Sequence, residues 1–107
     1  MAESLGALTE AVYYILLSLF EPMHGYGIMQ NVKALSSGRV SMGAGTLYGA
    51  IGTLVEKGWI KPLENASDDR KKEYVITENG KKIVRAELNR LEELLQNGRH
   101  ILGGSLS

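Results

Sequence analysis

The segment from Leu8 to Phe20 restricts the fold more than any other, because as a helix it is apolar on nearly every side. Thr9 or the residues before it start the helix, and Pro22 prevents its continuation. At about 1.5 Å per residue the helix spans about 20 Å, too short to cross a bilayer core of about 30 Å. Such a helix needs cover on both sides. Because a chain of 107 residues has few other segments to cover it, we expect a partner subunit to pack against one face of this helix, at Leu8, Val12 and Ile15.

The composition excludes several classes of protein. A hydrophobic share of 44% is ordinary for a globular domain and argues against wholesale disorder. The absence of cysteine rules out disulfides, cysteine-ligated metals and cysteine nucleophiles. The two histidines, His24 and His100, lie far apart in the sequence, and no nucleophile–base pair or metal set can be assembled. We therefore expect no enzymatic activity, no metal and no cofactor.

The start of the chain bears on its location. Met1-Ala2-Glu3-Ser4 lacks the basic region that precedes the apolar stretch of a secretory signal. Together with the absence of cysteine, this predicts a cytoplasmic protein with no membrane association.

The charge of the chain bears on nucleic-acid binding. The formal net charge is zero, with 12 basic and 12 acidic side chains, so no global field attracts DNA. Residues 1–60 hold only three of the basic side chains, Lys33, Arg39 and Lys57. DNA binding would therefore depend on a local basic cluster.

The middle of the chain alternates periodic apolar segments with turn residues. It predicts a helix from His24 to Leu35, a helix from Ala44 to Lys57, and two extended segments, Trp59–Leu63 and Glu73–Ile76. Gly38 and Gly58 follow the two helices, as is typical of helix ends. The polar stretch between the extended segments has the composition of a hairpin loop.

A last helix follows the hairpin. Thr77 and Glu78 are typical of an N-cap and a first turn, and Gly98 is expected to end or fray the helix. Its apolar side chains form a coiled-coil-like seam at spacings of four, three and four residues: Val84, Leu88, Leu91 and Leu95. The seam predicts dimerisation. Packing of the helix back onto its own domain is the alternative.

The order of these elements predicts the fold class. Three helices, a β-hairpin and a further helix make a mainly α protein, a winged helix-turn-helix with an additional C-terminal dimerisation helix. We expect residues 1–76 to form the DNA-binding domain, residues 77–102 the dimerisation helix and residues 103–107 a flexible tail.

The helix from Ala44 to Lys57 has two unlike faces. One is apolar and packs into the domain: Leu47, Ile51, Leu54 and Val55. The other is rich in glycine and hydroxyl groups: Gly45, Thr46, Gly49, Gly52, Thr53 and Glu56, with Tyr48 at its border. Each glycine costs about 1 kcal/mol relative to alanine, and a bare face lets the backbone approach a DNA groove closely. A tolerant surface helix, or packing against another helix, is the alternative.

Polar groups on that helix and on the hairpin suit DNA. Thr46 and Tyr48 offer hydroxyls to phosphates or base edges, whereas Glu56 would repel phosphate, so we expect the N-terminal half of the helix to enter the groove. Arg70, Lys71 and Lys72 lie where a wing tip is expected and would track phosphates with a salt-dependent affinity. A solvated hairpin end is the alternative, because two aspartates precede them and partly cancel their charge.

The start of the second helix is a further candidate. Its backbone N–H groups can hold a phosphate, with the Tyr26 hydroxyl assisting. The alternative makes Tyr26 a core residue and His24 a partly exposed cap. The candidate DNA contacts are Tyr26, Gly45, Thr46, Tyr48, Gly49, Thr53, Arg70, Lys71 and Lys72.

Taken in order, five segments resemble the PadR-like transcriptional regulators. They are Leu8–Leu19, His24–Ile28, Gly45–Gly49, Arg70–Tyr74 and Ile76–Gly80. The resemblance implies a repressor that dimerises through its first and last helices, binds a roughly palindromic operator and releases it when a small molecule binds. It also implies that the helix of Thr46 and Tyr48 enters the major groove, that Arg70 and Lys71 approach the minor groove, and that Tyr26 touches the backbone.

Two departures from the family pattern matter. Many members have a basic residue where this chain has Gly52 or Thr53, which favours weaker or different recognition. Members that sense drugs stack flat ligands on a tryptophan of the last helix, whereas Trp59, the single tryptophan here, lies at the start of the wing. The leading hypothesis is a DNA-binding regulator with a double-stranded operator as its partner. The alternative is a winged helix used for protein–protein interaction, which would suit the neutral charge.

Overall fold

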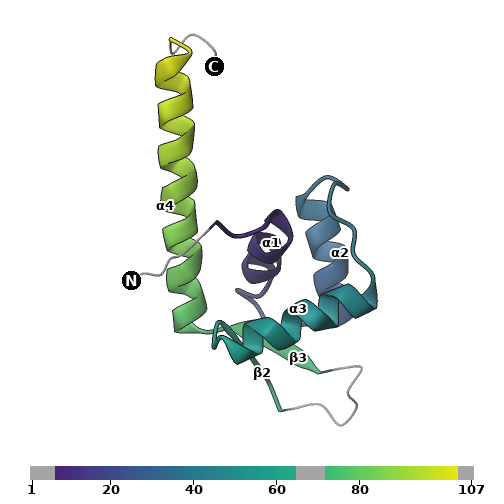
Figure 1. Ribbon diagram of the computed structural model, residues 1–107. Helices are drawn as coiled ribbons and strands as arrows, with labels where there is room; N and C mark the ends of the chain where they lie inside the picture. Colours follow the sequence, from purple (N-terminus) through teal and green to yellow (C-terminus); the bar gives the residue numbers. More distant parts are fainter. Residues whose placement is uncertain (1–6, 65–71, 104–107) are drawn as a thin grey trace.

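The computed structural model describes residues 7–64 and 72–103 of the chain. Its elements are α1 (Glu10–Ser18), β1 (Met23–His24), α2 (Gly25–Leu35), α3 (Ala44–Glu56), β2 (Ile60–Pro62), β3 (Glu73–Ile76) and α4 (Glu78–Ile101). Figure 1 shows α1, α2 and α3 gathered beside the strands, with α4 as a long arm. The predicted order of elements is confirmed, and so is the mainly helical winged helix-turn-helix with an added C-terminal helix.

The first helix begins where the sequence indicates but ends earlier. The Val12 N–H donates to Thr9 Oγ1 at 3.1 Å, which makes Thr9 the N-cap. After the helix the chain turns, and the Leu19 carbonyl accepts a hydrogen bond from the Ile76 N–H at 2.8 Å. The prediction that the helix reaches Phe20 is therefore wrong, because its end is tied to β3 instead.

One apolar core joins the helices to the sheet. Its most deeply buried side chains are Ile15, Leu16, Leu19, Ile28, Val32, Leu47, Ile51, Leu54, Ile60, Ile76 and Val84. Ile15 and Val84, both expected at a subunit interface, are 0% and 5% exposed in the chain alone. They pack inside the chain and offer a partner almost no surface. Burial of each such side chain stabilises the fold by about 1.5–3 kcal/mol.

The sheet contains a third strand that the sequence did not indicate. β3 lies between β1 and β2, and both pairings are antiparallel. Met23 pairs with Tyr74 and His24 with Glu73. A strand of two residues shows no alternation of apolar and polar side chains, so periodicity could not reveal it. The predicted hairpin is confirmed, with its first strand shortened to Ile60–Pro62.

The start of α4 depends on Thr77 and Gly80. The Gly80 N–H donates to Thr77 Oγ1 at 3.0 Å, and the Thr77 hydroxyl donates to the Gly58 carbonyl at 2.7 Å. A Cβ on Gly80 would lie 2.1 Å from the carbonyl oxygen of Trp59, so only glycine permits this close approach. The predicted cap at Thr77 is confirmed.

The C-terminal half of α4 extends beyond the other described elements (Figure 1). Residues 91–103 are all exposed. The helix continues through Gly98 to Ile101, so the expectation that Gly98 ends it is wrong. Of the predicted tail, residues 104–107 lie outside the described part of the chain. Among the described helices none has the length and apolar character needed to span a membrane.

Candidate functional site

The exposed face of α3 is bare. Leu47, Ile51 and Leu54 point into the core, as predicted, while the glycines and threonines of the opposite face are exposed. A Cβ built on Gly45, Gly49 or Gly52 would meet no atom within 4 Å. No other described segment of this chain therefore packs against these three glycines, and the alternative of helix packing within the chain is not realised there among the described residues.

The N-terminal end of α3 also faces solvent. Gly43 is its N-cap and has no side chain with which to cap the first turn. Gly43, Ala44 and Gly45 are all exposed. Because the first N–H groups of a helix have no partner within the helix, this end has the polarity that favours an anion.

Tyr48 brings the start of α2 next to α3. Its side chain is 43% exposed. A Cβ on Gly25 would lie 2.1 Å from the Tyr48 hydroxyl oxygen and 2.6 Å from Cζ. The tip of the tyrosine ring thus rests on the first residue of α2. The sequence offered Tyr26 and Tyr48 as separate candidates, and it gave no sign of the contact that joins their two segments.

The start of α2 is capped by a side chain. The Gly27 N–H donates to His24 Nδ1 at 3.1 Å, which confirms His24 as a partly exposed cap. Tyr26 is exposed, and its hydroxyl accepts a hydrogen bond from Gln30 Nε2 at 3.2 Å. The alternative that Tyr26 is a core residue is therefore wrong.

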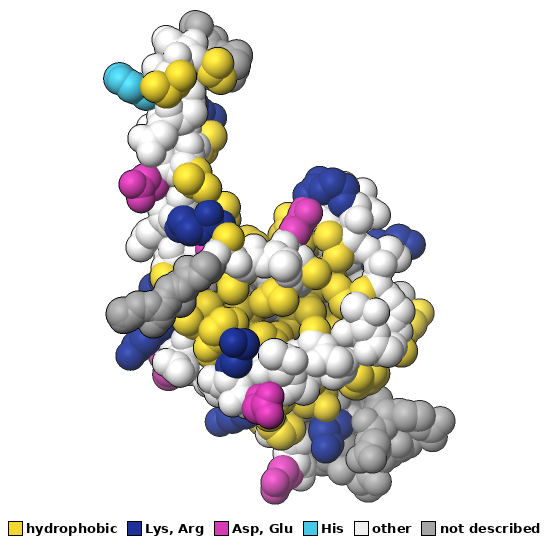
Figure 2. Space-filling model, viewed as in Figure 1, with side chains coloured by type: hydrophobic (Ala, Val, Ile, Leu, Met, Phe, Trp, Pro, Cys, Tyr) yellow, Lys and Arg dark blue, Asp and Glu magenta, His cyan; other side chains and the backbone are white. Residues whose placement is uncertain are grey.

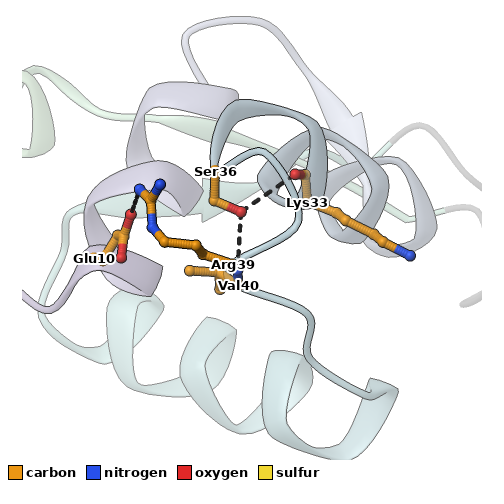
Figure 3. Close-up of polar contacts among 5 residues, drawn as sticks. All are labelled: Glu10, Lys33, Ser36, Arg39 and Val40. Atoms are coloured by element: carbon orange, nitrogen blue, oxygen red, sulfur yellow. Dashed lines mark hydrogen bonds and ion pairs between the residues drawn. The ribbon is translucent and has the colours of Figure 1, made fainter.

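Polar contacts hold the turn between α2 and α3, as Figure 3 shows. The buried Ser36 hydroxyl donates to the Lys33 carbonyl at 3.2 Å and accepts from the Val40 N–H at 2.9 Å. Arg39 forms an ion pair with Glu10 at the start of α1. These contacts set the path of the chain into α3. Sequence reasoning did not select Ser36, because a serine after a helix gives no sign of its burial.

Part of the predicted basic wing can be placed. Of the predicted residues, Lys72 lies before β3 and is half-buried. Lys61 on β2, which the sequence analysis did not select, is exposed. Arg70 and Lys71 lie outside the described residues. Within the described part of the chain, the hairpin thus carries two basic side chains, whereas α3 carries none.

A second surface feature is a groove between α1, α3 and α4. It has a volume of about 630 Å³, and its walls are mainly apolar. Leu8 and Val12 line one side, Leu54 and Trp59 another, and Ile83 the third. Thr53, a predicted DNA contact on α3, also borders the groove. Figure 2 shows hydrophobic side chains gathered on this face of the body, next to α4. Leu8 and Val12 are both partly exposed, so the predicted interface residues of this segment border the groove.

The groove has a charged edge that the sequence analysis missed. Glu87 is 6% exposed, and Arg90 donates to both of its oxygens, from Nε at 2.8 Å and from Nη2 at 2.6 Å. The Leu8 N–H donates to the same carboxylate at 3.3 Å. The hydrogen bonds from Arg90 lower the pKa of Glu87. The pair ties the segment before α1 to α4. Its spacing of three residues is visible in the sequence, but its burial is not.

The remaining seam residues of α4 are exposed. Leu88, Leu91 and Leu95 keep much of their surface, and so does Leu94 beside them. An exposed apolar stripe of this length on a projecting helix suits a contact with another molecule.

The amino-acid sequence is similar to those of known proteins. Residues 14–86 match the transcriptional regulator PadR-like family. A Streptomyces fradiae protein, described as an uncharacterized 37.1 kDa protein in transposon TN4556, is 32% identical over 73 residues, which cover 68% of this chain and 20% of that protein. The chain thus spans only a small part of the length of that relative.

Solved structures share the fold over most of the chain. A PadR family transcriptional regulator from Eggerthella lenta is 25% identical with a TM-score of 0.68, covering 86% of this chain and 80% of the other. RosR of H. salinarum is 28% identical with a TM-score of 0.64, covering 84% and 76%. A transcriptional regulator from Clostridium thermocellum, at 21% identity, TM-score 0.66 and coverage of 91% and 92%, supports the fold alone.

Proposed function

We propose that this chain, which belongs to the PadR-like family of transcriptional regulators, is a homodimeric repressor that binds a roughly palindromic DNA operator. The uncovered, glycine-lined face of α3 carries the proposal, because such a face lets the backbone approach a groove closely. The proposed contacts are Tyr26, Gly45, Thr46, Tyr48, Gly49, Thr53 and Lys72, with Arg70 and Lys71 outside the described residues.

The charges of the described residues indicate that α3 alone would not supply the affinity for DNA. The exposed face of α3 lacks Lys and Arg, so its contacts supply fit and hydroxyl hydrogen bonds more than electrostatic attraction. The wing lysines and the exposed N-terminal end of α3 would supply the phosphate contacts. Two linked copies would double every contact, and their two-fold symmetry would match a palindromic site.

Residues on α1 and α4 support the dimer. Leu8 and Val12 border the groove, and Leu88, Leu91 and Leu95 line the projecting arm. We assign residues 1–76 to DNA binding and residues 77–102 to dimerisation, with the protein acting in the cytoplasm. Pairing would close the groove, whose volume falls in the range of small-molecule pockets, and we place there the small-molecule effector that releases DNA.

The experiment that tests DNA binding is selection from a random-sequence duplex pool with the full chain at low salt. We expect enrichment of a two-fold symmetric motif, bound with nanomolar affinity that falls steeply as salt rises. Transcription from a promoter that carries the motif should fall when the protein is present.

Matched lysine variants locate the surface. Lys72→Ala should reduce the slope of log affinity against log salt by about 1 for each subunit. Lys82→Ala, which removes an exposed charge from α4, should leave the slope unchanged. A pool without enrichment, together with salt-insensitive binding of a protein partner, would instead support the alternative of a protein–protein interaction module.

A further inference from the structure

The two segments assigned to DNA contact meet at one point, where the tip of the Tyr48 ring lies against Gly25. Gly25 is the first residue of α2, and Tyr48 lies in the second turn of α3. A Cβ on Gly25 would be 2.1 Å from the tyrosine oxygen, and real Cβ atoms essentially never approach another atom within 3.0 Å. The ring tip therefore occupies the space that a side chain at position 25 would need.

We propose that Gly25 is a positioning residue that holds the Tyr48 phenol in its DNA-binding position. The proposal rests on the proposed function, because it takes Tyr48 as a DNA contact. With 43% of its surface exposed, Tyr48 is fixed at one edge and open at the other. A side chain that is already ordered in the free protein loses less conformational entropy when it binds.

The surface beneath the ring is itself held in place. Gly25 follows His24, which pairs with Glu73 in the sheet and caps α2 through the Gly27 N–H. Because β1 and the start of α2 are both fixed, the ring takes its position from the body of the protein as well as from α3. Gly25 is buried, whereas the glycines on the exposed face of α3 have open space around them.

A double-mutant cycle with Gly25→Ala and Tyr48→Ala tests the proposal. The probe is the duplex that the wild-type chain selects from the random pool. We expect each single variant to bind about tenfold more weakly, which corresponds to about 1.4 kcal/mol. Gly25→Ala should cost nothing further in the Tyr48→Ala background, because the methyl then fits into the space that the ring leaves.

A Thr46→Ala background is the control. Thr46 is exposed on the same helix and is not among the atoms nearest to a Cβ on Gly25, so the losses from Thr46→Ala and Gly25→Ala should add. Additive losses with Tyr48→Ala as well would show that Gly25 acts through the fold in general and would overturn the positioning role. Should Gly25→Ala alone not fold, the double variant decides. Folded protein with the affinity of Tyr48→Ala supports the proposal, and an unfolded double variant overturns it.

A measurement without DNA separates the two proposals. In the free wild-type chain, NMR should show a nuclear Overhauser contact between the Gly25 α protons and the Tyr48 ring, and its absence overturns the positioning role alone. Unchanged affinity in Tyr48→Ala overturns the assignment of Tyr48 as a DNA contact, and the positioning role with it. Weaker binding in Tyr48→Ala with unchanged binding in Gly25→Ala leaves the DNA site standing and overturns the role of Gly25.

Discussion

At the scale of single residues, Gly80 shows how one missing side chain permits the junction between the hairpin and α4. An added Cβ would lie 2.1 Å from the Trp59 carbonyl oxygen and 2.7 Å from Ile76 Cγ1, and the carbonyl belongs to the backbone. We expect Gly80→Ala to lower the free energy of unfolding by about 1–3 kcal/mol, measured by urea denaturation. Gly98→Ala is the matched control. It adds a methyl where no atom lies within 4 Å and should stabilise α4 by about 0.5–1 kcal/mol. Equal stability of the two variants would contradict the geometry at the start of α4.

Glu87 makes the stability of the fold depend on pH. Its pKa is lower in the folded chain than its ordinary value of 4.5, chiefly because Arg90 donates hydrogen bonds to it. The stabilisation is therefore fully present above about pH 4.5 and is lost as the pH falls through the lowered pKa. We expect Glu87→Gln to lower the free energy of unfolding by about 1–2 kcal/mol near neutral pH, and this difference from wild type to shrink in acid.

The control for this prediction is Glu92→Gln, which changes an exposed carboxylate on the same helix. Urea denaturation across the acidic range should give Glu92→Gln the pH dependence of the wild type. If Glu87→Gln also kept the wild-type dependence, the buried ion pair would not contribute to acid sensitivity.

At the scale of elements, the glycines of α3 lower the stability of the helix but are expected to favour DNA binding. Gly49→Ala adds a methyl into open space, so it should raise the free energy of unfolding by up to about 1 kcal/mol. The same methyl stands on the face proposed to approach DNA, and we expect it to weaken binding of the selected duplex about tenfold. Urea denaturation and fluorescence anisotropy measure the two effects. A variant that is more stable and binds equally well would place Gly49 away from the groove.

The elements also show what the sequence can predict. The caps Thr9 and Thr77 and the apolar face of α3 depend on neighbours within one or two turns, so local patterns were sufficient. The burial of Ile15 inside its own chain was not predictable. A helical wheel shows that one face of a helix is apolar, but it does not show which segment packs against that face. The contact between Gly25 and Tyr48 was not predictable either, because it joins two helices. The sequence around each residue shows small residues and a tyrosine but not that the two segments meet.

At the scale of the whole molecule, the net charge and the shape favour DNA binding by a dimer over binding by a single copy. The net charge is zero, and the exposed face of α3 has no basic side chain. A single copy would therefore bind DNA through few phosphate contacts, and its affinity would be modest. The projecting half of α4 places exposed leucines away from the body, where a second copy can reach them (Figure 1).

The double substitution Leu91→Glu with Leu95→Glu tests this pairing. Two carboxylates on the exposed stripe should prevent association, because burying unpaired charges costs several kcal/mol. Light scattering at micromolar concentration should give a dimeric mass for the wild type and a monomeric mass for the variant, with unchanged helical content by circular dichroism. Affinity for the selected duplex should fall by at least a hundredfold, since the two half-sites are no longer bound by linked subunits. Asn97→Glu adds a charge on the opposite side of α4 and should remain dimeric. A monomeric wild type that binds the duplex with the same affinity as the variant would show that α4 serves another purpose.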